Sequence, residues 1–173
     1  MANSAVEAQQ PATPKVSLRP ISDTDLPLLQ FIYASTRERE LQQVPWSDEQ
    51  KNAFVLMQFN AQHRHYQTHF SDGRFDLILL GDEPVGRLYV GRWPFEISVI
   101  DISLLPEWRG RGIGGRLLAE LIHEADALGK RVSVHVEKFN PARHLYERLG
   151  FIKVEDLEVY DHMIRLPAAR AGT

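Results

Sequence analysis

Apolar and polar positions repeat with two different periods along the chain, and the changes of period predict where strands and helices lie. Short apolar or alternating runs, typical of strands, occupy residues 16–20, 75–80, 84–90, 96–105, 131–136, 151–154 and 159–166. Helical spacing or helix caps mark residues 22–33, 46–70, 113–128 and 141–149. The predicted order is β-α-α-β-β-β-α-β-α-β-β, a mixed α/β fold with a right-handed crossover over residues 96–136.

Two of these segments give the clearest patterns. In residues 113–128 apolar side chains recur at helical spacing, and Gly129 closes the helix. Residues 96–105 form a nearly continuous apolar run, which favours a strand buried on both faces. Asp101 interrupts that run. A carboxylate in such surroundings is either paired with a buried partner or functional.

The two ends of the chain differ from its middle. Residues 1–15 and 167–173 are rich in small residues and proline and have no periodic apolar face, so we expect a disordered N-terminal tail and a flexible C-terminal tail. No linker interrupts residues 16–166, which are therefore expected to form one domain. The chain starts without a secretory signal pattern, and no apolar run approaches the roughly 20 residues of a membrane span.

Composition narrows the classes of function. The 173 residues contain no cysteine, which excludes disulfides, cysteine-ligated zinc and thiol catalysis. The formal net charge of −3 disfavours nucleic acid as a partner, because such proteins present a basic face. We therefore expect a cytoplasmic protein that binds neither nucleic acid nor a membrane.

A glycine-rich loop carries the most specific chemistry. Residues 106–115 read PEWRGRGIGG, follow the apolar strand and open the amphipathic helix. Glycines let backbone N–H groups approach a ligand, and a helix N-terminus carries a partial positive charge. With Arg109, Arg111 and Arg116 beside it, the loop is predicted to cradle a pyrophosphate; the alternative is a glycine-rich turn without a ligand.

Two common phosphate-binding motifs do not fit this loop. Gly110, Gly112 and Gly115 match GxGxxG, and Glu137 follows at a dinucleotide-like spacing. However, four residues separate the strand from the first glycine, and only 36 residues follow Glu137, too few for a dinucleotide domain. A P-loop fails because Arg116 and Leu117 stand where lysine and serine or threonine are needed.

The loop instead resembles a different family. Arg109-x-x-Gly112-x-Gly114 is similar to the acetyl-CoA pyrophosphate motif of the GNAT superfamily of N-acetyltransferases. Residues 140–151 resemble its N-x-x-A-x-x-x-Y-x-x-x-G-F segment, with one residue fewer between Asn140 and Ala142. The close resemblance covers residues 84–154. It implies a mixed, mostly antiparallel central sheet with a splayed parallel strand pair, flanked by about four helices. It also implies acetyl-CoA as co-substrate, no metal, and a small-molecule or peptide amine as acceptor.

The resemblance also implies which residues hold the cofactor. In the family, the strand before the loop bulges and its backbone contacts the pantetheine arm and the acetyl carbonyl, which corresponds here to Leu104 and Leu105. Asn140 becomes a contact for the cofactor arm, while its sequence position equally suits a helix N-cap. The expected pyrophosphate cradle consists of Arg109, Gly110, Arg111, Gly112, Ile113, Gly114 and Gly115.

Candidate acid and base follow from the same comparison. Tyr146 falls at the family's general-acid position, where it would protonate the leaving thiolate; from its pattern alone it would be a core aromatic. An ammonium must also lose a proton before it can attack. Glu96, at the start of the long strand, is the favoured base and Asp101 is the alternative. A water relay without a dedicated base also remains open.

Other readings of the sequence stay open beside this one. His63, His65 and His69 suggest a metal, but no further ligand is evident and a solvated or acceptor-lining helix face is favoured. The aromatic residues between 46 and 70 suit a core, an acceptor pocket or a homodimer contact. The rival functions are a CoA-binding sensor that lacks catalysis and a transferase of another acyl chain.

Overall fold

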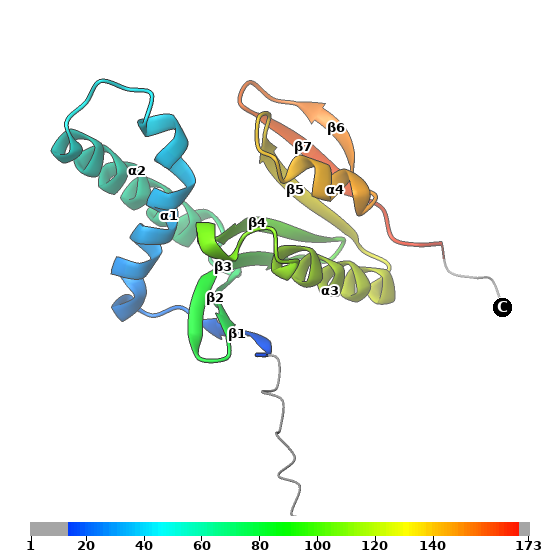
Figure 1. Cartoon of the computed structure of the whole chain (residues 1–173). Coiled ribbons are helices and arrows are strands. Elements are labelled where there is room, and N and C mark those ends of the chain that lie inside the picture. Colours follow the sequence, from blue (N-terminus) through cyan, green and yellow to red (C-terminus); the bar gives the residue numbers. More distant parts are fainter. Residues whose placement is uncertain (1–13, 170–173) are drawn as a thin grey trace, which may run out of the picture.

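The computed structural model describes residues 14–169, so the predicted tails lie mostly outside the described residues (Figure 1). The strands are β1 Val16–Pro20, β2 Arg74–Leu80, β3 Glu83–Arg92, β4 Glu96–Leu104, β5 Arg131–Glu137, β6 Ile152–Asp156 and β7 Tyr160–Arg165. The α-helices are α1 Leu26–Leu41, α2 Asp48–His69, α3 Ile113–Leu128 and α4 Arg143–Arg148. Two short 3-10 helices, η1 Asp23–Asp25 and η2 Pro106–Trp108, precede α1 and the glycine-rich loop. The predicted order of strands and α-helices is confirmed.

The strands form one sheet with the order β1-β2-β3-β4-β5-β7-β6. All neighbours are antiparallel except β4 and β5, which are parallel. The parallel pairing runs from Glu96 opposite Arg131 to Val99 opposite Val134. β4 continues to Leu104 without a further partner on that side, so the two strands separate beyond Val99. The expected mixed sheet with a splayed parallel pair is confirmed.

A bulge in β4 reverses the orientation of its second half. Val99 pairs with Val90 of β3, but Asp101, not Ile100, pairs with Tyr89. The extra residue turns Asp101 to the same face of the sheet as Ser98, whereas strict alternation would point it to the other face. The resemblance placed the bulge beside Leu104; the structure places it at Ile100.

The two faces of the sheet are covered by different helices (Figure 1). One buried cluster joins strand residues such as Val99, Val132 and Val134 to α3 and to Tyr146 of α4. The other cluster joins Leu77 of β2 to α1 and α2. The face under α1 and α2, which also carries Asp101, is called the polar face below.

Helix boundaries follow the strength of the local signals. α3 spans the predicted residues and ends at Gly129, whose φ of 66° suits glycine. α2 begins after Ser47, which accepts a hydrogen bond from the Gln50 N–H. α1 runs eight residues past its predicted end at Tyr33, because its last turns are polar and carry no apolar pattern. No helix in residues 14–169 is long and apolar enough to cross a membrane.

Candidate active site

The predicted pyrophosphate cradle is formed by backbone at the N-terminus of α3, with open space beside its glycines. Gly110 and Gly112 have φ values of 70° and 81°, which favour glycine, and a Cβ at either position would meet no atom within 4 Å. The Arg116 N–H donates to the Gly112 carbonyl, so the N–H groups of Ile113, Gly114 and Gly115 have no partner within the helix. Such free donors in open space fit a pyrophosphate.

Packing places this helix start between the splayed strand and α4. A Cβ at Gly114 would lie 3.9 Å from the Cδ1 atoms of Ile102 and Leu104 on β4. A Cβ at Gly115 would lie 3.6 Å from Cδ1 of Leu145, the neighbour of Tyr146 on α4. The structure therefore brings together the loop, the end of β4 and α4.

The end of β4 presents one of the two predicted backbone donors. The Leu105 N–H donates to the Val85 carbonyl at 2.9 Å and is used by the sheet. Because successive amides of a strand point in opposite directions, the Leu104 N–H points to the open edge. The Leu104 carbonyl on that edge accepts a hydrogen bond from Arg109 Nε at 2.8 Å.

The arginines of the loop are engaged with protein atoms. Arg109 also donates to the Ser35 hydroxyl at 3.1 Å, which ties the loop to α1. The guanidinium of Arg111 lies over the Trp108 ring, 4.8 Å from its centroid. The predicted site therefore offers backbone N–H groups as donors, while Arg109 positions the loop.

Tyr146 reaches the site from α4. Its side chain is buried (3% exposed) and packs edge-on against Phe151, with ring centroids 5.4 Å apart. Burial raises the pKa of its hydroxyl, and the negative charge of Asp101 raises it further. The hydroxyl thus stays protonated at neutral pH and can donate a hydrogen bond, and it acquires no partner from the described residues.

Asn140 is not the N-cap of α4, which is Ala142 without a side-chain cap; Asn140 instead forms a turn just before the helix. Its Oδ1 accepts a hydrogen bond from the Ala142 N–H at 2.9 Å. This turn delays the start of α4 to Arg143, two residues after the predicted start. The side-chain NH₂ group remains for a ligand.

Asp101 belongs to a buried ion-pair network. It accepts hydrogen bonds from Arg87 Nε at 3.3 Å and Nη2 at 2.9 Å, from the Ser103 hydroxyl at 2.8 Å and from the Tyr66 hydroxyl at 3.3 Å. Arg87 is only 2% exposed, and its Nη2 also donates to Gln62 of α2 at 2.8 Å. These four bonds engage the lone-pair sites of the Asp101 carboxylate within this network.

Glu96 lies apart from the residues gathered at the loop. It starts β4, roughly 25 Å along the strand from Leu104. Its carboxylate accepts hydrogen bonds from Arg131 Nε at 2.6 Å and from the Ser133 hydroxyl at 2.7 Å. The structure therefore does not bring the favoured base together with Leu104.

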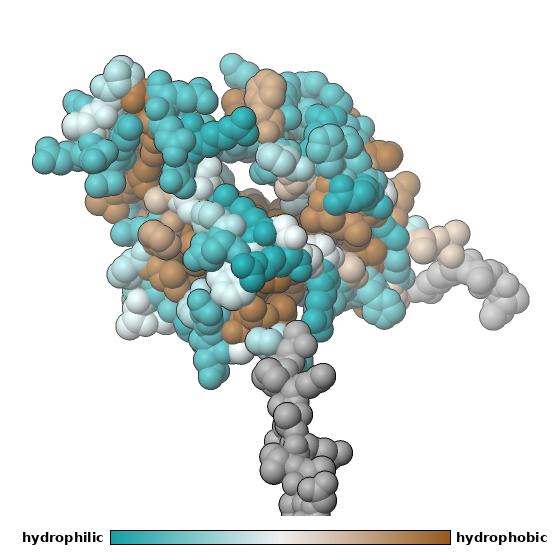
Figure 2. Space-filling view, viewed as in Figure 1, coloured by the Kyte–Doolittle hydropathy of each residue, from teal (hydrophilic) through white to brown (hydrophobic). Residues whose placement is uncertain are grey.

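A hollow lies between the part formed by α1 and α2 and the part formed by β5, β7 and α4 (Figure 2). An ion pair between Arg37 of α1 and Glu137 of β5, 2.9 Å long, joins its two sides. Sequence reasoning missed Arg37 and Arg87. An arginine inside an otherwise apolar strand, near a lone aspartate in the next strand, was the available signal for Arg87.

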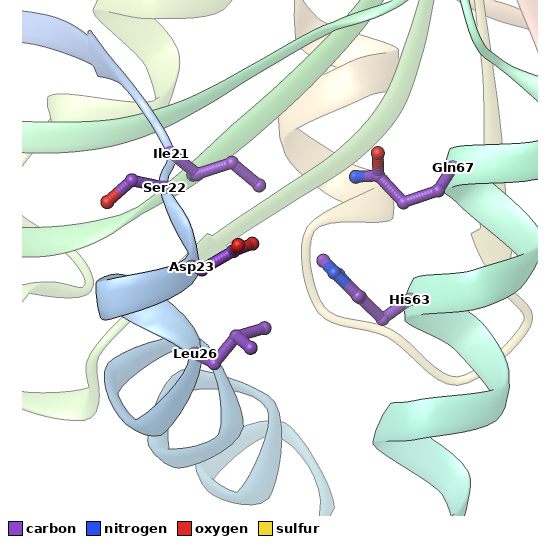
Figure 3. A pocket seen from close by; sticks show the side chains of 6 residues that line it. All are labelled: Ile21, Ser22, Asp23, Leu26, His63 and Gln67. Carbon is purple, nitrogen blue, oxygen red and sulfur yellow. The ribbon is translucent and has the colours of Figure 1, made fainter.

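A separate cavity of about 280 Å³ lies between the start of α1 and α2 (Figure 3). Asp23 faces His63 and Gln67 across it. Neither β4, β5 nor the loop lines it, so it is not part of the site.

Within the described residues no group of three or more histidine, aspartate or glutamate side chains could hold a metal ion. The rings of His65 and His69 stack on one another, with their centroids 4.1 Å apart.

The fold and the loop define a class: an α/β protein in which a helix N-terminus with free amides opens beside a splayed parallel strand pair. The sequence model of the acetyltransferase (GNAT) family matches residues 32–151, which is more than half of the chain. The chain therefore belongs to the GNAT acetyltransferase family.

Several curated relatives match in sequence. N-alpha-acetyltransferase RimI of Mycobacterium tuberculosis is 38% identical over 98 residues, covering 56% of this chain and 60% of the relative. The [ribosomal protein bS18]-alanine N-acetyltransferase of Haemophilus influenzae is 36% identical over 61 residues, 35% of this chain and 42% of the relative. Mycothiol acetyltransferase of Thermobifida fusca is 37% identical over 90 residues, covering 49% of this chain and 27% of the relative. The matched part thus spans between about a quarter and three fifths of these relatives.

Solved structures share the fold. PaiA N-acetyltransferase from Thermoplasma acidophilum, in complex with coenzyme A, has a TM-score of 0.65 at 17% identity, covering 88% of this chain and 99% of that chain. Spermidine N-acetyltransferase from Vibrio cholerae, in complex with CoA and spermine, has a TM-score of 0.58 at 20% identity, covering 88% and 96%. At these identities the likeness establishes the fold alone.

Proposed function

We propose that the protein is an acetyl-CoA-dependent N-acetyltransferase that moves the acetyl group to a primary amine by direct attack, without a covalent enzyme intermediate. The observation that carries the proposal is the opening of β4 and β5 beside the free amides of Ile113, Gly114 and Gly115. The absence of cysteine agrees with direct attack, since no thiol nucleophile is available. Acetyl-CoA, when bound, supplies a thioester carbonyl for the amine to attack and a thiolate that leaves.

Different groups of the chain bind the cofactor, stabilise the developing charge and donate the proton. The amides at the start of α3 hold the pyrophosphate, and the Leu104 N–H on the open edge stabilises the oxyanion that develops on the carbonyl. The protonated Tyr146 hydroxyl donates to the leaving sulfur. The ion pair between Asp101 and Arg87, on the polar face of the sheet, holds the bulge of β4 in place.

The acceptor is proposed as a primary amine that enters the hollow between α1 and β5. One relative is named an N-alpha-acetyltransferase and another is named for an alanine of ribosomal protein bS18, so the first acceptors to test are short peptides with a free N-terminal alanine. Spermidine and a lysine peptide with a blocked N-terminus complete the panel. Acetylated product by mass spectrometry, with release of free CoA, is the expected result. Acetyl-CoA binding without transfer to any of these amines would favour the CoA-binding sensor.

Tyr146→Phe is expected to lower kcat by up to about 10²-fold, within the range of general-acid effects. The ring still packs against Phe151, so the melting temperature should stay near that of the wild type. Tyr89→Phe is the matched control, because it removes the hydroxyl of another buried tyrosine that lacks a hydrogen-bond partner. Steady-state kinetics with saturating acetyl-CoA measures both. An unchanged kcat where chemistry limits turnover would return Tyr146 to a packing role.

A further inference from the structure

The proposed transfer requires a group that takes a proton from the amine, and neither predicted carboxylate is placed to do so. A primary ammonium with a pKa of about 10.4 is mostly charged at neutral pH and has no lone pair for attack. Asp101 already accepts four hydrogen bonds, and Glu96 is held by Arg131 and Ser133. The inference below rests on the proposed function and concerns this proton.

Two histidines lie next to the place where β4 and β5 separate. His135 directly follows Val134, the last residue of β5 that pairs with β4, and its partner on β7 is His162. The two rings are stacked, with centroids 4.4 Å apart and an angle of 7° between their planes. His135 is exposed.

His135 lies on the polar face of the sheet. Side chains alternate along a strand, so His135 shares its face with Ser133, whose hydroxyl bonds to Glu96. The bulge of β4 turns Asp101 to that same face, at the next residue pair of β3 and β4 after Val99. Asp101 and His135 therefore occupy corresponding positions on the two separating strands, just beyond the last paired residues Val99 and Val134.

The surroundings of His135 lower its pKa and so favour the neutral ring. Partial desolvation of the His135 ring lowers its pKa and a positive charge on His162 lowers it further, while Glu155 and Glu96 act in the opposite direction. The carboxylate of Glu155 on β6 lies 3.7 Å from His162 Nδ1. Two stacked imidazolium rings would repel one another.

The remaining charged groups of β5 are already paired. Glu137 forms its ion pair with Arg37 of α1, and Arg131 forms one with Glu96 of β4. The ring nitrogen of His135 is therefore the basic atom on this part of the polar face that carries no ion-pair partner among the described residues.

We propose that His135 accepts the proton of the acceptor ammonium and that its stacking on His162 holds the ring in place for this task. An N–H bond of the ammonium breaks, its electron pair stays on nitrogen as the attacking lone pair, and the proton moves to a ring nitrogen of His135. The exposed imidazolium returns that proton to solvent. The nitrogen loses a second proton as the amide forms, and the leaving thiolate takes up one, so one proton is released per transfer. Glu96 stabilises the imidazolium electrostatically.

The kinetic test compares His135→Gln with His123→Gln, which removes an exposed histidine from α3 outside the site. The pH profile of kcat/KM is measured with an amine that the wild type acetylates. We expect His135→Gln to lose about 10²-fold near neutral pH. The loss should shrink at high pH, where the amine is neutral without help. His123→Gln should follow the wild type at every pH.

A titration of the histidine ring signals by NMR tests the same proposal without an acceptor. The signal that disappears in His135→Gln should titrate below the ordinary pKa of about 6.5. It should move to higher pH in His162→Gln, because the neighbouring positive charge is gone. A His135 that titrates above pH 7, or a His135→Gln variant with the wild-type pH profile, overturns the proposal. A wild type that acetylates no amine counts against the proposed function instead, and the titration then decides about His135.

Discussion

Gly114→Glu is expected to abolish acetyl-CoA binding, with a loss of affinity of about 100-fold or more, which is about 2.7 kcal/mol. The new side chain would start in the space between α3 and β4, 3.9 Å from Ile102 and Leu104, and its carboxylate would repel the phosphates. Folding should survive, because an acidic residue in the first turn of a helix stabilises it. Calorimetry with acetyl-CoA, beside a melting curve, measures both effects.

The control for this prediction is Ala119→Glu, which adds the same charge on the exposed side of α3. Its acetyl-CoA affinity should match that of the wild type. Gly112 is a poorer test position, because its φ of 81° strains any side chain and mixes folding with binding. Undiminished affinity in a folded Gly114→Glu variant would sink the assignment of the loop.

Asp101→Asn is expected to cost roughly 3 kcal/mol of folding stability, since it leaves the buried Arg87 without a counter-charge. For a domain of this size the melting temperature should fall by roughly 6 to 12 °C. Kinetic effects should show little rescue at high pH, because the carboxylate holds structure and takes no proton. Thermal unfolding and a pH–rate profile of the same variant separate the two roles.

Asp72→Asn serves as the control, because Asp72 is exposed in the turn between α2 and β2. It should unfold at the wild-type temperature. If Asp101→Asn kept its melting temperature and instead lost kcat/KM most strongly at low pH, Asp101 would be the base that the sequence offered as an alternative.

Local signals in the sequence predicted the elements whose boundaries depend on local chemistry. The apolar stripe and Gly129 defined α3, and the Ser47 cap defined the start of α2. The last two turns of α1 were missed because Arg37 and its neighbours form a helix through propensity alone, without an apolar face. The insertion of β7 between β5 and β6 is set by long-range pairing, which no local pattern reports.

The residues of the candidate site also differ in whether local sequence patterns could predict them. Motif spacing predicted the loop and Tyr146, because each lies within a short, contiguous motif of the sequence. The engagement of the Leu105 amide by Val85, and the bulge that turns Asp101 toward Arg87, depend on the register between β3 and β4. The contact of His135 with His162 depends on the register between β5 and β7. Residues that meet only through strand register were therefore not predictable from a single sequence.

The most direct test of the account is a crystal structure of the protein with bound CoA. We expect the pyrophosphate to lie on the N–H groups of residues 110–115. The pantetheine arm should run along the open edge of β4 past Leu104, with its sulfur beside the Tyr146 hydroxyl. CoA bound elsewhere, for example in the cavity beside Asp23 and His63, or a sulfur remote from Tyr146, would contradict it.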